Sequence, residues 1–232
     1  MNDSRRWSAV CVFSIAMALL EAAIVTYLRV FLDRVDPYQP NPLPVPAWLM
    51  HIEIAREAAT VVMLASVAWL AGRNWRARFG YFLIAFGVWD ILYYVFLVPF
   101  TGWPRSLLDW DVLFLIPLPW WGPVLAPVAI AAMMVVGGTL ITQFGKREAP
   151  LWPQFSWWLA SLAGALLALY VFMADAIHAP EWSEDALSGM LPGAFDWPLF
   201  LLALGLMGSP IANMCWQLRA GAFSRRRNDG QP

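Results

Sequence analysis

The sequence predicts an all-α fold: a polytopic membrane helical bundle of six transmembrane helices. The 232 residues are 60% hydrophobic and only 13% charged, with a mean hydropathy of +0.58. A soluble domain carries about 25% charged residues. The apolar residues also gather in runs of roughly 20, the length that a helix needs to cross a bilayer. A soluble fold of this length could not bury so much apolar surface, so we expect a lipid bilayer as partner and no nucleic acid.

The six apolar runs together make up a single integral membrane domain over residues 1–232. Each run is long enough for a spanning helix at a rise of about 1.5 Å per residue. The spans are predicted at about 8–32, 47–71, 79–99, 122–143, 156–178 and 198–218.

The connection between the third and fourth spans, residues 101–121, is too rich in proline for a regular seventh span. We expect an interfacial or re-entrant segment, because irregular backbone is tolerated at membrane depth only where it packs in protein or lines water. Ser106 and Asp109 have the spacing of a capping box, which predicts that a short helix opens there. The prolines of this connection are Pro104, Pro117 and Pro119.

Basic residues predict the orientation of the bundle. They precede the first span, follow the sixth and lie in every second connection between spans. Because cytoplasmic loops carry the excess of Lys and Arg, both termini are predicted to be cytoplasmic, in the plasma membrane of a bacterium (the inner membrane). These residues are Arg5, Arg6, Arg73, Arg76, Arg78, Lys146, Arg147, Arg219, Arg225, Arg226 and Arg227.

Acidic residues inside the apolar runs are the main functional signal. A charge near the bilayer centre costs about 2.5–3.5 kcal/mol on insertion scales, so such residues are rare and usually functional. They lie in the half of the spans opposite the basic loops, and we expect one polar pocket there. The acidic residues are Glu21, Glu53, Glu57, Asp90 and Asp175. The residues expected to converge are Glu21, Glu57, Asp90, Asp111 and His178.

Helical spacing predicts which side chains accompany these carboxylates. Glu53 and Glu57 share one helical face, and Arg56 is placed to pair with Glu53 at i, i+3. Tyr93 and Tyr94 share a face with Asp90. Arg29, near the end of the first span, is expected to reach toward water. The neighbours expected around the site are Glu53, Arg56, Tyr93 and Tyr94.

A metal centre is one interpretation of this pocket. Asp175 and His178 have the carboxylate-x-x-His spacing seen in metal-binding helical bundles. Oxygen and imidazole ligands suit iron, manganese or zinc. Such a site predicts oxidoreductase-like or hydrolytic chemistry on a lipophilic small molecule. The candidate metal ligands are Glu21, Glu57, Asp90, Asp111, Asp175 and His178.

Two other interpretations remain open. The carboxylates could be structural, holding together an accessory or assembly subunit that has membrane-protein partners. They could also serve a small proton- or cation-coupled transporter, since carboxylates at the membrane midplane form proton relays. The chain has no Gly-x-Ser-x-Gly, His-Glu-x-x-His or phosphate-binding glycine loop. Whether it is an enzyme is therefore left open by the sequence.

Overall fold

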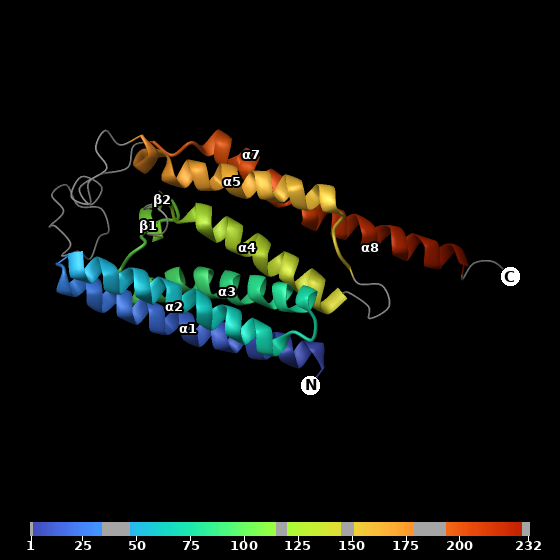
Figure 1. Ribbon diagram of the computed structural model, residues 1–232, viewed down its shortest axis with the longest axis horizontal. Helices are drawn as coiled ribbons and strands as arrows, with labels where there is room; N and C mark the ends of the chain where they lie inside the picture. The colour runs from blue at the N-terminus through green and yellow to red at the C-terminus, as the bar shows by residue number, and fades with distance from the viewer. Residues whose placement is uncertain (1, 34–46, 115–119, 145–150, 179–193, 229–232) are drawn as a thin grey trace.

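The computed structural model describes residues 2–33, 47–114, 120–144, 151–178 and 194–228. Within this part of the chain, six helices are long and apolar enough to cross a membrane, which confirms the predicted number of spans. The helices run along a common long axis (Figure 1). The segments that qualify are Asp3–Phe31, His51–Ala71, Trp75–Thr101, Leu125–Phe144, Phe155–Ile177 and Trp197–Ala220.

Asparagine caps begin two of the first three helices. Helix α1 (Asp3–Phe31) starts after Asn2, whose side chain accepts a hydrogen bond from the backbone N–H of Arg5 at 2.9 Å. Helix α3 (Trp75–Thr101) starts after Asn74, which accepts from the N–H of Ala77 at 2.9 Å. Such caps satisfy N–H groups that have no partner in the first helical turn. Helix α2 (Ala47–Ala71) lies between them in the chain.

Helix α3 lies at the centre of one half of the bundle, in contact with α1, α2 and α4 (Leu125–Thr139). Glycines on both helices let α3 and α4 approach closely. A Cβ atom added at Gly87 would lie 2.5 Å from the carbonyl oxygen of Ala131, and one added at Gly138 would lie 2.4 Å from that of Gly80. Small residues at such crossings are how membrane helices maximise packing contacts. Helix α4 continues directly into a short π-helix, η1 (Leu140–Phe144).

The connection between α3 and α4 contains a β-hairpin, an element that the all-α prediction did not include. Strand β1 (Trp110–Phe114) pairs antiparallel with β2 (Trp120–Pro123), and Asp111 lies opposite Gly122. Aromatic and β-branched residues at these positions favour a strand. The short helix expected at Ser106 does not form; residues 105–109 make turns instead. We call the end of the bundle that carries this hairpin, where α1 and α3 end and α2 and α4 begin, the hairpin end (Figure 1).

The last third of the described chain forms a second group of helices. Helix α5 (Phe155–Ile177) packs on α7 (Trp197–Met207), and α8 (Ser209–Asn228) follows after Gly208. The sixth predicted span corresponds to Trp197–Ala220, in which a turn at Gly208 separates α7 from the first part of α8. The turn lies just before Pro210, which has no N–H to donate to the carbonyl of Leu206 and whose ring crowds that carbonyl. Helix α8 extends beyond the other helices toward the C terminus (Figure 1).

The helices expose large apolar side chains. Leu70 is 80% exposed, Phe155 76% and Val12 65%. In water this much exposed apolar surface would be strongly unfavourable, whereas acyl chains accommodate it. The exposed faces and the six apolar helices are compatible with an integral, multi-pass membrane protein in contact with the lipid bilayer.

Candidate functional site

A largely buried group of three charged side chains joins α1 to α2. Arg56 donates from its Nε to Glu53 Oε2 at 2.9 Å and from Nη2 to the same oxygen at 2.8 Å, as the i, i+3 spacing predicts. The Nη1 of Arg56 contacts the carboxylate of Glu21 on α1. Glu21 is only 5% exposed. One guanidinium therefore holds two carboxylates from two helices.

Thr60 completes the environment of Glu21. It lies one turn after Arg56 on α2, and its hydroxyl donates to Glu21 Oε2 at 3.3 Å. Thr60 is 2% exposed, so this hydrogen bond is shielded from solvent. Both polar partners of Glu21 thus come from one face of α2, because side chains at i and i+4 lie above one another on a helix.

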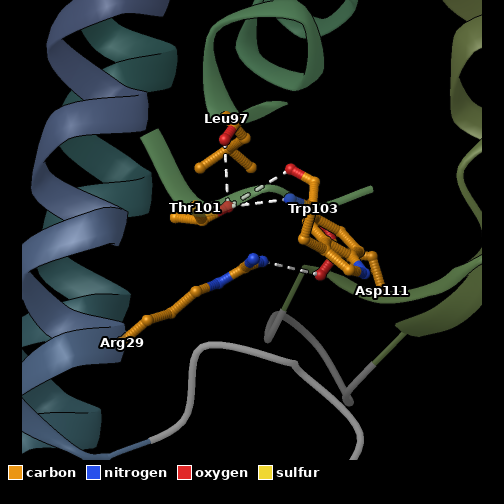
Figure 2. Close-up of polar contacts among 5 residues, drawn as sticks. All are labelled: Arg29, Leu97, Thr101, Trp103 and Asp111. Atoms are coloured by element: carbon orange, nitrogen blue, oxygen red, sulfur yellow. Dashed lines mark hydrogen bonds and ion pairs between the residues drawn. The ribbon is translucent and has the colours of Figure 1, made fainter. Parts of the chain in front are cut away.

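A second buried ion pair ties α1 to the hairpin. The Nη2 of Arg29 lies 3.3 Å from Oδ1 of Asp111 in β1. The guanidinium carbon of Arg29 lies 4.2 Å from the centre of the Trp103 ring, a cation–π contact. Tyr94 of α3 shares a side-chain hydrogen bond with Asp111. Figure 2 shows Arg29 extending from α1 toward Asp111 and Trp103.

The end of α3 positions Trp103. Gly102 ends the helix with a φ of +71°, a left-handed conformation that glycine adopts without strain. The hydroxyl of Thr101 donates to the carbonyl of Leu97 at 2.9 Å and accepts from the N–H of Trp103 at 3.2 Å (Figure 2). The chain therefore turns sharply, and the buried indole of Trp103 faces Arg29.

Tyr93 and Asp90 lie on α3 within electrostatic range of both ion-pair groups. Tyr93 interacts with the charges of Arg29, Arg56, Asp90 and Asp111. Asp90 in turn interacts with the charge of Asp111. The arginines of the two groups are therefore neighbours of one tyrosine, and we treat all these residues as one cluster.

Asp109, just before β1, and Asp111, within β1, have opposite electrostatic environments. Burial raises the pKa of Asp111 to about 6, although the charge of Arg29 and the hydrogen bond with Tyr94 oppose this rise. For Asp109, partial burial also raises the pKa, but hydrogen bonds from the Ser106 side chain and from the backbone N–H groups of Arg105 and Ser106 outweigh it. The pKa of Asp109 therefore lies below its ordinary value, and its carboxylate serves the turn.

The cluster is rich in negative charge. Five carboxyl groups face two guanidinium groups among the described residues, which leaves an excess of three negative charges if every carboxyl group is ionised. Glu57 belongs to this count because its charge acts on Arg56. An excess of buried charge is strongly unfavourable in a low-dielectric medium. The carboxyl groups are Glu21, Glu53, Glu57, Asp90 and Asp111.

The candidate metal ligands differ in where they lie. Glu21 and Asp111 are buried, but each pairs with an arginine from another element. In the described ranges, no three His, Cys, Asp or Glu side chains form a group that could hold a metal ion. The arginine side chains therefore lie next to these carboxylates, where a metal ion would have to lie in order to be bound by them.

His178 and Asp175 stand at the end of α5. The Nδ1 of His178 lies 2.7 Å from the carbonyl oxygen of Ala174, and its ring stands edge-on to Tyr170 at 6.3 Å. The side chain is exposed, and Asp175 is half-buried. The imidazole therefore contacts its own helix, as a residue that caps the last turn does.

Three residues of the cluster were not among the residues that the sequence placed in the site: Arg29, Thr60 and Trp103. Arg29 was expected to reach toward water, but it is buried, with 8% of its surface exposed. The local pattern carries no sign of these contacts, because Asp111 is 82 residues from Arg29 and Thr60 is 39 residues from Glu21.

No protein-family model matches this chain, and no curated protein or solved structure is significantly similar to it.

Proposed function

We propose that this protein is a small proton-coupled membrane protein whose carboxylate cluster, in the half of the bundle nearer the hairpin end, binds the protons. The observation that carries the proposal is the ratio of five carboxyl groups to two guanidinium groups in that cluster. Among the described residues, protons or another cation would neutralise this excess, and the arginines already lie next to the carboxylates. Proton relays in membranes use such carboxyl groups.

The closeness of Asp90 and Asp111 supports protons as the occupants. Two neighbouring carboxylates repel each other when both are ionised, so one proton is favourably bound by the pair. The hydroxyl group of Tyr94, which hydrogen-bonds Asp111, is able to donate to a carboxylate and to accept from a protonated carboxyl group. The proton would then be held by the pair rather than by one residue.

The distribution of basic residues supports a placement in a bacterial inner membrane with both termini in the cytoplasm. In that orientation the hairpin end faces the outside of the cell. The cluster would then exchange protons with the extracytoplasmic side.

A direct test is to count protons. Detergent-purified protein in weak buffer would be titrated between pH 8 and 5, together with the variants Asp90→Asn, Glu57→Gln and Asp109→Asn. We expect the wild type to bind at least about one proton more per chain than Asp90→Asn. The Asp109→Asn control should match the wild type, because the low pKa of Asp109 keeps it ionised over this range.

Equal uptake by the wild type and both cluster variants would contradict the proposal. So would near-stoichiometric iron, manganese or zinc in the wild type that is lost in Glu57→Gln, measured by elemental analysis of the same samples. That second result would restore the metal-centre interpretation.

A second candidate function, an assembly subunit, is favoured by the fact that the ion pairs connect separate elements. Arg56 joins α2 to α1, and Arg29 joins α1 to the hairpin. If tying these elements is the whole role of the charges, Glu21→Gln will weaken the fold without changing proton uptake. The protein would also co-purify in mild detergent with a defined membrane partner.

A further inference from the structure

Arg29 is buried with part of its guanidinium unsatisfied. Its Nη2 pairs with Asp111, but in the part of the chain that the structure describes, its Nη1 is buried without a hydrogen-bond partner. The side chain is 9% exposed. The Trp103 ring covers one face of the guanidinium (Figure 2). That contact leaves the N–H groups in the guanidinium plane in need of an acceptor.

An unpaired buried donor is unfavourable, and more so on a charged group. The acceptor should therefore be an oxygen atom that approaches in the plane of the guanidinium. Arginine presents its donors as a fork that matches phosphate and carboxylate oxygens. The carboxylate of Asp111 accepts from Nη2, which is one arm of this fork. The other arm, Nη1, has no acceptor among the described residues.

The position of Arg29 indicates where that oxygen comes from. Arg29 lies in the last turn of α1, two residues before Phe31. The end of an apolar span lies at the depth of lipid headgroups. The neighbouring side chains of α1 are large, apolar and exposed: Tyr27 is 72% exposed, Val30 64% and Phe31 69%. Acyl chains would cover them, and the phosphate groups of the surrounding lipids would lie at the level of Arg29.

We propose that Arg29 and Trp103 form a binding site for the phosphate group of a phospholipid at the hairpin end of the bundle. Arg29 donates to a phosphate oxygen from Nη1, and Trp103 holds the guanidinium plane in place. Asp111 is the internal anion that competes with the phosphate for the same guanidinium. This proposal does not depend on proton binding by the cluster.

Because Asp111 and the phosphate compete for Arg29, substitutions of Arg29 and of Asp111 should change the affinity for the lipid in opposite directions. Arg29→Gln removes the donor, so we expect the affinity for phosphatidylglycerol to fall about tenfold or more. Asp111→Asn removes the competing charge and its repulsion, so the affinity should rise. Arg78→Gln is the matched control, because Arg78 also lies over an indole, that of Trp69 at 3.5 Å, but near the opposite end of α3. It should leave the affinity unchanged.

The measurement is a titration of each detergent-purified protein with phosphatidylglycerol, read by native mass spectrometry. Inorganic phosphate serves as the soluble competitor. Failure of inorganic phosphate to compete supports a lipid site, whereas binding of inorganic phosphate as tight as that of the lipid would overturn it in favour of a soluble anion. Equal lipid affinity in the wild type and Arg29→Gln would also overturn the proposal.

A double variant keeps the test valid if Arg29→Gln alone does not fold. Arg29→Gln with Asp111→Asn removes both charges of the pair, so no unpaired charge remains buried. It should fold and bind phosphatidylglycerol more weakly than the wild type. Wild-type affinity in the folded double variant would contradict the site.

Discussion

Glu21 and Arg29 lie eight positions apart on α1, and both are buried with a charged partner from another element. Their contacts show which features of the site could be predicted at the level of single residues. The Glu53–Arg56 pair follows from helical spacing, because i, i+3 neighbours must meet. The partners of Glu21 and Arg29 depend on how helices and hairpin pack, which local spacing does not encode.

The contribution of the Glu21–Arg56 contact can be measured by substitution. Glu21→Gln should lower the free energy of unfolding by about 1–3 kcal/mol, because a buried hydrogen bond to a charged group is weakened while Glu53 still neutralises Arg56. Arg56→Gln should cost more, about 3–5 kcal/mol, since it leaves buried carboxylates without their cation.

Unfolding in mixed micelles would measure both variants, with Ser66→Ala as control, because Ser66 is an exposed residue of α2 that bonds only its own helix at Val62. The double variant should lose less than the sum of the two single variants, since the residues act as a pair. Strict additivity would argue that the contact contributes nothing.

Asp111 should make the stability of the protein depend on pH. Its pKa is raised from 3.8 to about 6, so between these values the folded state holds a proton that the unfolded state has lost. The stabilisation is fully present below about pH 4 and is lost as the pH rises through about 6. The loss is about 3 kcal/mol at most, at 1.36 kcal/mol per pKa unit.

Thermal unfolding in detergent at several pH values between 4 and 7.5 would check this. Relative to Asp111→Asn, the wild type should lose stability as the pH is raised through this range. Parallel pH profiles for the two proteins would show that Asp111 does not titrate here.

At the scale of elements, the sequence predicted helices well and the hairpin not at all. Apolar runs of about 20 residues leave little choice but helices in a bilayer, which explains the agreement in the number of spans. The proline content of residues 101–121 correctly argued against a seventh span, but proline does not reveal strand pairing. Register between β1 and β2 depends on contacts with the bundle, such as that between Trp120 and Phe172 of α5.

A comparison of alanine substitutions at two glycines isolates the effect of the left-handed turn that ends α3. A Cβ atom added at Gly102 or Gly205 meets nothing within 4 Å, so neither substitution by alanine creates a clash. They differ in backbone conformation, because only Gly102 has a positive φ, at +71°. Gly102→Ala should destabilise the fold by about 1–2 kcal/mol, whereas Gly205→Ala in α7 should be neutral or stabilising by up to about 1 kcal/mol.

The same unfolding assay would compare the two proteins. Because Gly102 precedes Trp103, Gly102→Ala should also change the fluorescence of a buried tryptophan, and Gly205→Ala should not. Equal stabilities for the two alanine variants would show that the left-handed turn is not required.

For the whole molecule, the central feature is a cluster of carboxyl groups that extends from the hairpin to the middle of α1 and α3. Composition was sufficient to predict a membrane protein, and helical periodicity was sufficient to predict that polar residues share faces. The excess of acidic over basic residues within the apolar runs is visible in the sequence, whereas the pairing of each arginine with its carboxylates emerged only from the packed structure. Arg29 turns inward and Arg78 lies on Trp69 instead.

The most direct test is the infrared spectrum of the protein reconstituted in lipid at neutral pH, which reports protonated carboxyl groups separately from carboxylates. We predict an absorption band of a buried, protonated carboxyl group that is lost or reduced in Asp90→Asn and Glu57→Gln and unchanged in Asp109→Asn. A spectrum in which every carboxyl group is ionised would contradict the account, because the excess negative charge would then have to be balanced by bound metal or another cation.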